Sequence, residues 1–427
     1  MVSRAATHTP MEKEQQHEVA IVGAGIAGLA TAVGLKRVGL PSLVLEKSPE
    51  LRAAGAALTL FPNAWRALEA LGVAHKLIPL YHAIERSRVT DLSSGTTREV
   101  PFSRTNRGDT GIRSVHRKAL LEALAEELEP GTIRFSSKIT SIDQEGSSPL
   151  TALHLDDGSV IKAKVVIGCD GVHSVVARWL GLAEAIDSGR SAIRGLAVFP
   201  EGHELINNEA LQYLGDGKRA GLVPLNSKEL YFFITHTSTA AGKPLSPPSS
   251  FTKEMAAEAE LTLIEVTENL AKDFPPEVQT AVRHLDPATV SWAPLLFRAP
   301  WNLVLGRIHR GCVAVSGDAM HPMTPEIGQG GCAALEDAVV LARSLARARS
   351  SAQLAAGVEG YTRERRWRSA GVVAAAYLSG WVQQGGNAGV WRWAAKWFRR
   401  RIYYRFIHPR IVEAIRGYDC GVLPPAE

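Results

Sequence analysis

The hydrophobic pattern near the N-terminus predicts a strand, a helix and a second strand within about thirty residues. Glu18–Val22 is a nearly continuous apolar run, which is typical of a buried parallel strand. An apolar helical segment runs from about Ile26 to Val38 and is followed by Gly39, a residue that often ends helices. A second apolar run, Ser42–Leu45, leads into Glu46. Together these segments predict a β-α-β unit.

The rest of the chain contains both helical hydrophobic patterns and the alternating patterns of strands. It predicts helices at 61–71 and 114–128, and residues 132–167 alternate as strands do. From about 190 to 290, strand-like pieces such as LAVFP and ELYFFITH are separated by Pro/Ser-rich loops such as PLSPPSS. A strand at 313–315 returns the chain to the first sheet, and the part after 351 is largely helical.

These elements indicate an α/β fold with a Rossmann-type nucleotide-binding domain, an inserted substrate domain with a mixed sheet, and C-terminal helices. The predicted boundaries are a disordered N-terminus at 1–16, a first nucleotide-binding part with some substrate-domain strands at 17–185, the substrate domain at 186–290, the second nucleotide-binding part at 291–350, and the helical region at 351–427.

Three glycines follow the first strand in GAGIAG, residues 23–28. Gly23 suits the tight turn, Gly25 lets a pyrophosphate approach the backbone, and Gly28 lets helix and strand pack closely. The helix N-terminus then favours an anion. Glu46 is placed to accept hydrogen bonds from a ribose. An ordinary glycine-rich turn is the alternative, but the combination of strand, glycines, helix and acid favours a dinucleotide site.

A second site is predicted in VAVSGDAMHPMTPEIGQGG, residues 313–331. Asp318 follows a strand and is placed to accept from the hydroxyls of a ribityl chain. The backbone of Gly328–Gly331 is placed to approach a flat ring, and the helix N-terminus beyond it favours negative charge there. Because NAD has no ribityl chain, this second site favours FAD. A turn or capping aspartate is the alternative reading of Asp318.

Composition excludes several other classes. Apolar residues make up 45% and charged residues 21% of the chain, as expected for a globular protein. A net charge of +5 is too small to indicate a nucleic-acid partner. The four cysteines form no CxxC and the histidines form no HExxH, so no metal site is predicted, and reduced thiols favour the cytoplasm. The N-terminus lacks a secretory signal, and an organelle transit peptide stays an alternative.

With a third stretch, CDGVHS at 169–174, the chain resembles the single-component FAD-dependent aromatic hydroxylases, the class that includes salicylate-hydroxylase-like enzymes, and among them the plant monooxygenase branch. The resemblance covers roughly 17–370 and rests on GAGIAG, CDGVHS and GDAMHPMTPEIGQGG in this order. Supporting stretches are GAALTLFPNAWRALEALG, SVHRKALLEAL, ALEDAVVLA and the C-terminal YDCG.

The resemblance implies a role for each matched position. Glu46 would bind the adenosine ribose, and Arg117 would contact the phosphate or ribityl region of FAD. Asp170 would lie where FAD and the nicotinamide cofactor both pass. The alternatives are a surface helix arginine for Arg117 and a helix cap for Asp170. Asp318 would hold the ribityl hydroxyls. The flavin ring would be lined by Pro325 and by the backbone of Gly330 and Gly331.

The implied reaction is a monooxygenation. NADPH or NADH would reduce FAD, O2 would form a flavin C4a-hydroperoxide, and one oxygen atom would enter a small aromatic or hydrophobic substrate. An epoxidase, an oxidative decarboxylase or a demethylase would use the same chemistry. A scaffold of this fold without redox activity and a plain NAD dehydrogenase are further alternatives, but they leave the two glycine sites or residues 313–331 unexplained.

The sequence identifies no catalytic base. Tyr213 and His236 fall in the predicted substrate domain and are weak candidates, since each is more often a structural residue. Tyr231, Phe232 and Phe233 are candidates for an apolar roof that keeps water from the flavin. Because neighbours on a strand face opposite ways, at least one of them is expected to be a core residue.

The segment 390–407, VWRWAAKWFRRRIYYRFI, is aromatic and basic. Its apolar residues recur on one helical face, which favours a helix that packs on the nucleotide-binding domain. A weak contact with a membrane surface is the second interpretation.

Overall fold

The computed structural model describes residues 14–51, 56–102, 110–144, 150–205, 208–215, 217–237, 263–348, 350–384, 402 and 408–426. The PLSPPSS loop and the segment 390–407, apart from Ile402, lie outside the described residues. The first strand begins at Glu14, and its first residues pair with Val160–Lys162. Residues 14–16, which the sequence prediction placed in a disordered N-terminus, therefore belong to this strand. No helix of the described residues has the length and apolar character that a membrane span needs.

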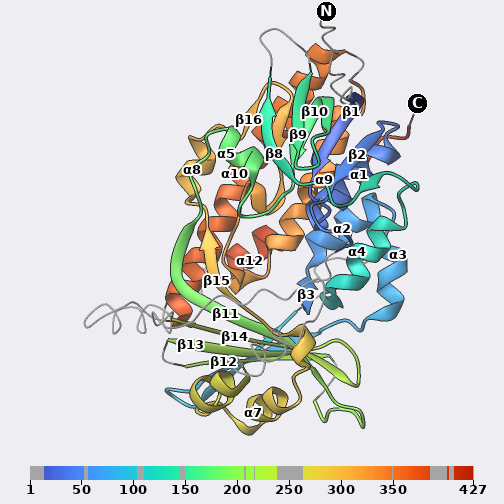
Figure 1. Ribbon diagram of the computed structural model, residues 1–427. Helices are drawn as coiled ribbons and strands as arrows, with labels where there is room; N and C mark the ends of the chain where they lie inside the picture. The colour runs from blue at the N-terminus through green and yellow to red at the C-terminus, as the bar shows by residue number, and fades with distance from the viewer. Residues whose placement is uncertain are drawn as a thin grey trace, which may run out of the picture.

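The first domain is built on a largely parallel sheet of eight strands (Figure 1). Its main path runs in the order β16 (His309–Arg310), β17 (Val313–Val315), β10 (Val160–Gly168), β1 (Glu14–Val22), β2 (Ser42–Leu45) and β7 (Ile133–Arg134). The antiparallel strands β9 (Thr151–Leu155) and β8 (Ile139–Asp143) extend it beside β10.

The parallel strands of this sheet end together. Val22 of β1 is paired with Leu45 of β2 and with Gly168 of β10, and Gly168 is paired with Val315 of β17. The residues that follow these four strand ends therefore meet at one edge, where open α/β sheets bind their ligands. They include GAGIAG, Glu46, the CDG stretch and the GD stretch.

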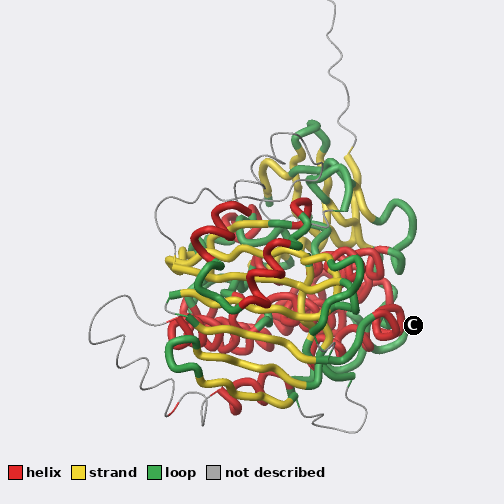
Figure 2. Tube along the Cα trace, turned by 90° about the horizontal axis from the view of Figure 1, so that it is seen from below, coloured by secondary structure: helices red, strands yellow, loops and turns green. Residues whose placement is uncertain are grey.

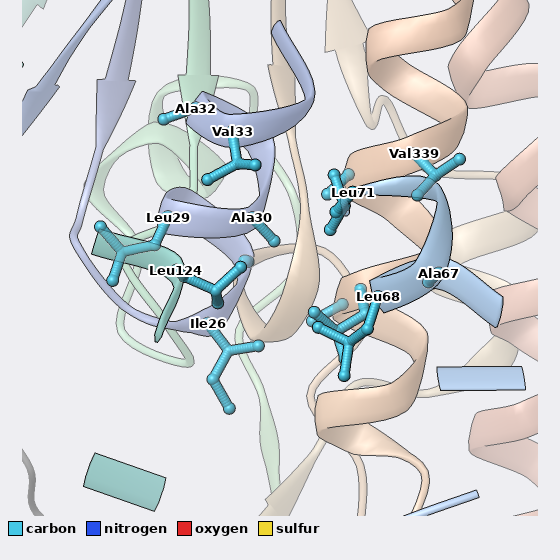
Figure 3. Close-up of a cluster of buried hydrophobic side chains, with 14 of the residues drawn as sticks. Ile26, Leu29, Ala30, Ala32, Val33, Ala67, Leu68, Leu71, Leu124 and Val339 are labelled. Carbon is cyan, nitrogen blue, oxygen red and sulfur yellow. The ribbon is translucent and has the colours of Figure 1, made fainter. Parts of the chain in front are cut away.

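Alternate residues of the strands pack into two hydrophobic cores, one on each side of the sheet. Val19 and Ile21 of β1 pack on one side of the sheet, while Ala20 and Val22 pack on the other. The first core is formed with α1 (Ile26–Arg37), α2 (Pro62–Ala70), α4 (Arg117–Ala125) and α9 (Gly330–Leu345). Figure 3 shows the apolar side chains of α1 facing those of α2 and α9. The second core includes residues of α5 (Val175–Trp179) and α8 (Pro300–Val304).

The second domain is a mixed sheet of seven strands. Their order is β15 (Ser291–Phe297), β11 (Ile186–Val198), β14 (Glu229–Thr237), β13 (Lys218–Pro224), β12 (Glu209–Leu214), β4 (Arg86–Asp91) and β5 (Thr96–Pro101). Strands β4 and β5 come from the first segment of the chain, and β4 joins the sheet by pairing with β12. Strand β15 pairs with β11, so this sheet continues past the predicted boundary at 290.

The two faces of the second sheet have different neighbours. The outer face carries Ile193, Leu222 and Phe232 and is covered by α7 (Pro276–Arg283) and the π-helical turn η2 (Val266–Leu270), as the view from below shows (Figure 2). The inner face carries Ala210 and Val223 and belongs to a separate aromatic cluster toward the first domain. Helix α10 (Ser351–Gln384) contacts α9, α8 and β13 and so bridges the two domains.

Short elements complete the described fold. They are α3 (Ala74–Leu77), α12 (His408–Arg416), and the 3-10 turns η1 (Ile78–Leu80), η3 (Pro287–Thr289), η4 (Gly317–Ala319) and η5 (Pro325–Ile327).

The predicted helix at 114–128 begins later than expected. Its first residues form β6 (Arg113–His116), which pairs with β3 (Ala57–Leu60). The sequence prediction was wrong here because pairing with a distant strand outweighs the local helical pattern.

Candidate cofactor and active site

The GAGIAG loop leaves its backbone open at the centre. Gly23 adopts φ 102°, in the left-handed region that favours glycine. A Cβ on Gly28 would lie 1.9 Å from the carbonyl oxygen of Gly23, so any side chain there would break the turn. A Cβ on Gly25 would meet no atom within 4 Å. The first turn of α1 has no acidic residue and no side-chain cap, so its N–H groups are suited to a phosphate.

Glu46 lies beside this loop. Its carboxylate is buried and accepts hydrogen bonds from the backbone N–H of Ala24, at 2.8 Å, and of Ser48, at 2.9 Å. Each oxygen can accept a further hydrogen bond, which is what contact with a ribose requires. Glu46 therefore fixes the loop and is well placed for the predicted ribose contact.

Asp170 has a capping function. Its Oδ2 accepts from the backbone N–H of Val175, at 2.7 Å, at the start of α5. Burial raises its pKa, while hydrogen bonds from Ser174 and Val175 act in the opposite direction. The Cα of Asp170 lies close to Gly23, because the two loops follow paired strands. The contact with cofactors remains a prediction.

The Asp318 carboxylate faces the start of α9. It is exposed and receives no hydrogen bond from the described residues. A Cβ on Gly330 would lie 3.8 Å from its Oδ1, so the acid and the first residue of α9 border the same space. Asp318 is the middle residue of the 3-10 turn η4 (Gly317–Ala319), so it is a turn residue, while its carboxylate caps no described backbone N–H. Its contact with the ribityl chain remains a prediction.

Pro325 and the neighbouring glycines shape the other side of this space. Pro325 begins η5, and Gly328 then turns the chain with φ 63° toward α9. Gly328 packs against the ring of Phe61 and Gly331 against Leu58. No side chain caps α9 and no acid stands in its first turn. Its N-terminus can therefore favour negative charge on a bound ring.

Arg117 is the first residue of α4, and its N–H donates to the carbonyl of Ala56 at 3.4 Å. This places it beside β3, on the side of the sheet that carries α1 and α9. Its contact with the cofactor remains a prediction.

Tyr213 and His236 lie on the outer face of the second sheet. Tyr213 packs in the core with α7, and burial raises its pKa to about 12. His236 lies edge-on to Trp292, and burial lowers its pKa. Both side chains point away from the first domain, because Tyr213 is two residues from Leu211 and His236 is four residues from Phe232, and residues an even number apart on a strand share a face. We therefore propose no catalytic role for either.

Comparisons with known proteins agree with this geometry. The family model described as "FAD binding domain" matches residues 16–376. Monooxygenase 2 of Arabidopsis thaliana is 40% identical over 431 residues, which cover 97% of this chain and 100% of that protein.

The chain belongs to the FAD-binding family of aromatic hydroxylases.

Its relatives share a cofactor and differ in what they act on. The FAD-dependent urate hydroxylase of Klebsiella pneumoniae is 29% identical, with 81% of this chain and 85% of that protein covered. The structure of Klebsiella pneumoniae HpxO with FAD and uric acid has a TM-score of 0.76 at 25% identity, with 94% and 96% of the two chains covered. A salicylate hydroxylase complex, at 22% identity and a TM-score of 0.70, shares the fold. The protein is thus an FAD-dependent monooxygenase.

In this hydroxylase, hydrogen bonds and ion pairs of the buried Asp337 carboxylate fix the loop that carries Asp318. Asp337 of α9 accepts from the N–H of Gly317 at 2.9 Å, from Nε2 of His321 at 2.7 Å and from Nε of Arg365 at 2.6 Å. Burial alone would raise the pKa of Asp337, but His321 and Arg365 outweigh it and hold the pKa below its usual value. His321 is fully buried, which is consistent with a structural role.

Glu336, next to Asp337 on α9, also pairs with Arg365 and links these charges to the C-terminal segment. It accepts from Asn63 Nδ2 at 2.6 Å, from Arg365 Nη2 at 2.7 Å and from Arg368 Nη2 at 2.9 Å. Both arginines lie over the ring of Tyr418, in the YDCG stretch. We call Arg365, Asp337, Glu336, Arg368 and His321 the ion cluster. Its two arginines were not identified from the sequence, although they stand three residues apart on one helix and so share a helix face.

Asp318→Ala is expected to weaken FAD binding at least about 10-fold, because hydrogen bonds to a carboxylate contribute roughly 1.5–3 kcal/mol. The melting temperature of the apoprotein should change by less than about 2 °C, since the side chain is exposed and without a described partner. Fluorescence titration of the apoprotein with FAD measures the affinity. The matched control is Glu268→Ala, an exposed acid on η2. Equal FAD affinity in both variants would contradict the assignment of Asp318.

Arg365→Met is expected to cost about 3–5 kcal/mol, because it leaves buried acids without their partner. Arg363→Met, at an exposed position of α10, should stay within about 0.5 kcal/mol. Urea unfolding measures both. Since the folded-state pKa of Asp337 is lowered, its stabilising contribution is present above its unfolded-state pKa and is lost as the pH falls below about 4. A loss in the Arg365 variant no larger than in the control would show that the ion cluster is not a stability determinant.

Proposed function

We propose that the protein uses NADPH or NADH to insert one oxygen atom of O2 into a small aromatic or hydrophobic substrate. The observation that carries this proposal is the position of the inner face of the second sheet. It lies against the η5 turn, and it presents aromatic side chains there. The same arrangement supports a substrate bound between that face and the cofactor loops.

Aromatic residues line the inner face. Tyr231 and Phe233 of β14 belong to the cluster that also holds Phe61 and Phe102, and Phe232 points to the opposite face. The Phe233 ring lies over Gly221, where any Cβ would be 2.3 Å from it. The expectation that one of the three residues at 231–233 is a core residue is therefore confirmed. Flat apolar surfaces of this kind suit an aromatic substrate.

Two arginines of the second sheet bind Glu326, in the loop that follows Asp318. Arg190 of β11 forms a buried ion pair with Glu326 of η5. Arg219 of β13 donates to the carbonyl of Glu326 at 3.4 Å and to Gln212 Oε1 at 2.9 Å. These contacts bring η5 and the aromatic face together and exclude water from the contact. Exclusion of water protects oxygen chemistry from unproductive side reactions.

Bound FAD supplies electron transfer from the nicotinamide and activation of O2. The chain's own residues bind and orient. The exposed Asp318 carboxylate is suited to the ribityl hydroxyls, and the uncapped N-terminus of α9 favours negative charge on the ring. We also propose the cytoplasm as the compartment, because reduced thiols are typical of it. The free thiols in the structure are Cys169, Cys312, Cys332 and Cys420.

The test is turnover of the FAD-loaded protein under air with NADH, NADPH and a panel of phenols. We expect flavin absorption, faster NAD(P)H consumption with at least one phenol, and a product that carries one atom of labelled O2. The Asp318→Ala variant, without added FAD, should consume no NAD(P)H. A product without the label would contradict oxygen insertion. A colourless protein that takes up no FAD would favour a scaffold without redox activity.

A further inference from the structure

Arg416 ends helix α12, and its backbone is fixed by two other arginines. Nη1 of Arg66 on α2 donates to the carbonyls of Arg416 and Tyr418, at 3.0 and 3.2 Å. Nη2 of Arg368 donates to the carbonyl of Ile415 at 2.8 Å. These cations satisfy carbonyls that a helix end leaves without partners. The backbone at the end of α12 is therefore fixed by Arg66 and by Arg368 of the ion cluster.

The Arg416 side chain lies between two aromatic rings. Its Cζ is 4.8 Å from the ring centroid of Phe61 and 4.8 Å from that of Phe102. Among the described residues its guanidinium makes no hydrogen bond and no ion pair. The Arg416 side chain is partly buried, and this burial lowers its pKa to about 10, so the group stays charged at neutral pH.

Arg298 provides a contrast within the same chain. Burial also lowers its pKa to about 10, but its N–H groups donate to the carbonyls of Ala183, Ala319 and Met320 at 2.6–2.9 Å. A desolvated charge is costly unless it is paired. Contacts with two rings offset part of this cost but use none of the five N–H donors. The donors of Arg416 are therefore suited to a ligand.

The two rings beside Arg416 indicate where a ligand of its guanidinium would bind. Phe61 packs against Gly328, in the loop that precedes α9. Phe102 belongs to the inner-face cluster of the second sheet together with Tyr231 and Phe233. The guanidinium thus lies between the cofactor loop and the aromatic face, in the region that the proposed function gives to the substrate.

We propose that Arg416 binds the anionic group of an aromatic substrate, so that the enzyme selects aromatic anions over neutral aromatics. A guanidinium matches a planar anion with two parallel hydrogen bonds, and the flanking rings accommodate the flat body of such a molecule. Arg416 is then a specificity-determining residue contributed by the C-terminal helix. This inference rests on the proposed function.

The probes are benzoate and benzamide, which share shape and differ in charge. Binding to the FAD-loaded full chain is measured by the change in flavin absorbance and by calorimetry. The wild type should bind benzoate at least about 10-fold more tightly than benzamide, as expected for charge-assisted hydrogen bonds. Arg416→Gln and Arg416→Met should abolish this preference while benzamide affinity changes less than about 3-fold. Arg416→Lys should restore part of the preference, and Arg363→Met should leave it unchanged.

A purely structural Arg416 gives a different result. Its variants would lower the melting temperature and weaken both ligands in parallel, with the ratio unchanged. That outcome, or a wild type that binds benzoate no better than benzamide, would overturn the inference, and the second result needs no variant to fold. A protein without bound FAD would instead contradict the proposed function, so the two failures are distinguishable.

Discussion

The ion pair between Arg365 and Asp337 lies in a fully buried part of the molecule, where neither charge is stable without the other. Asp337 also accepts from the N–H of Gly317 and from His321, so the loop that carries Asp318 is fixed to helix α9. Through Glu336 and Arg368 the same cluster reaches the end of α12. One set of buried charges therefore positions the loop with Asp318, the uncapped start of α9 and the end of α12 that carries Arg416.

The parallel sheet supplies the other half of the site. Its strands end in register, so the GAGIAG loop, Glu46 and the GD stretch meet at one edge although they are distant in sequence. The second sheet completes the arrangement by placing its aromatic inner face against η5, with Arg190 and Glu326 as the link. A long dinucleotide can thus lie along the edge with its ring end toward the aromatic face.

The cofactor motifs could be predicted from sequence because their chemistry is local. Gly23, Gly28 and Asp318 stand next to strand ends, and short-range patterns identify these positions. The faces of β14 could not be assigned because ELYFFITH is apolar on both, so Phe232 and Phe233 look alike until α7 is seen on one side. Arg416 gave no local indication, since its rings come from distant segments.

The most direct test is hydrogen–deuterium exchange of the apoprotein and the FAD-loaded protein, read at single-amide resolution. The central claim is that one FAD molecule lies on two bare backbone sites held in place by the ion cluster. It predicts that FAD slows exchange both at Gly23–Gly28 and at Gly328–Cys332. Protection confined to the first loop would indicate a ligand that stops at the dinucleotide edge. That result would contradict the account of the second site.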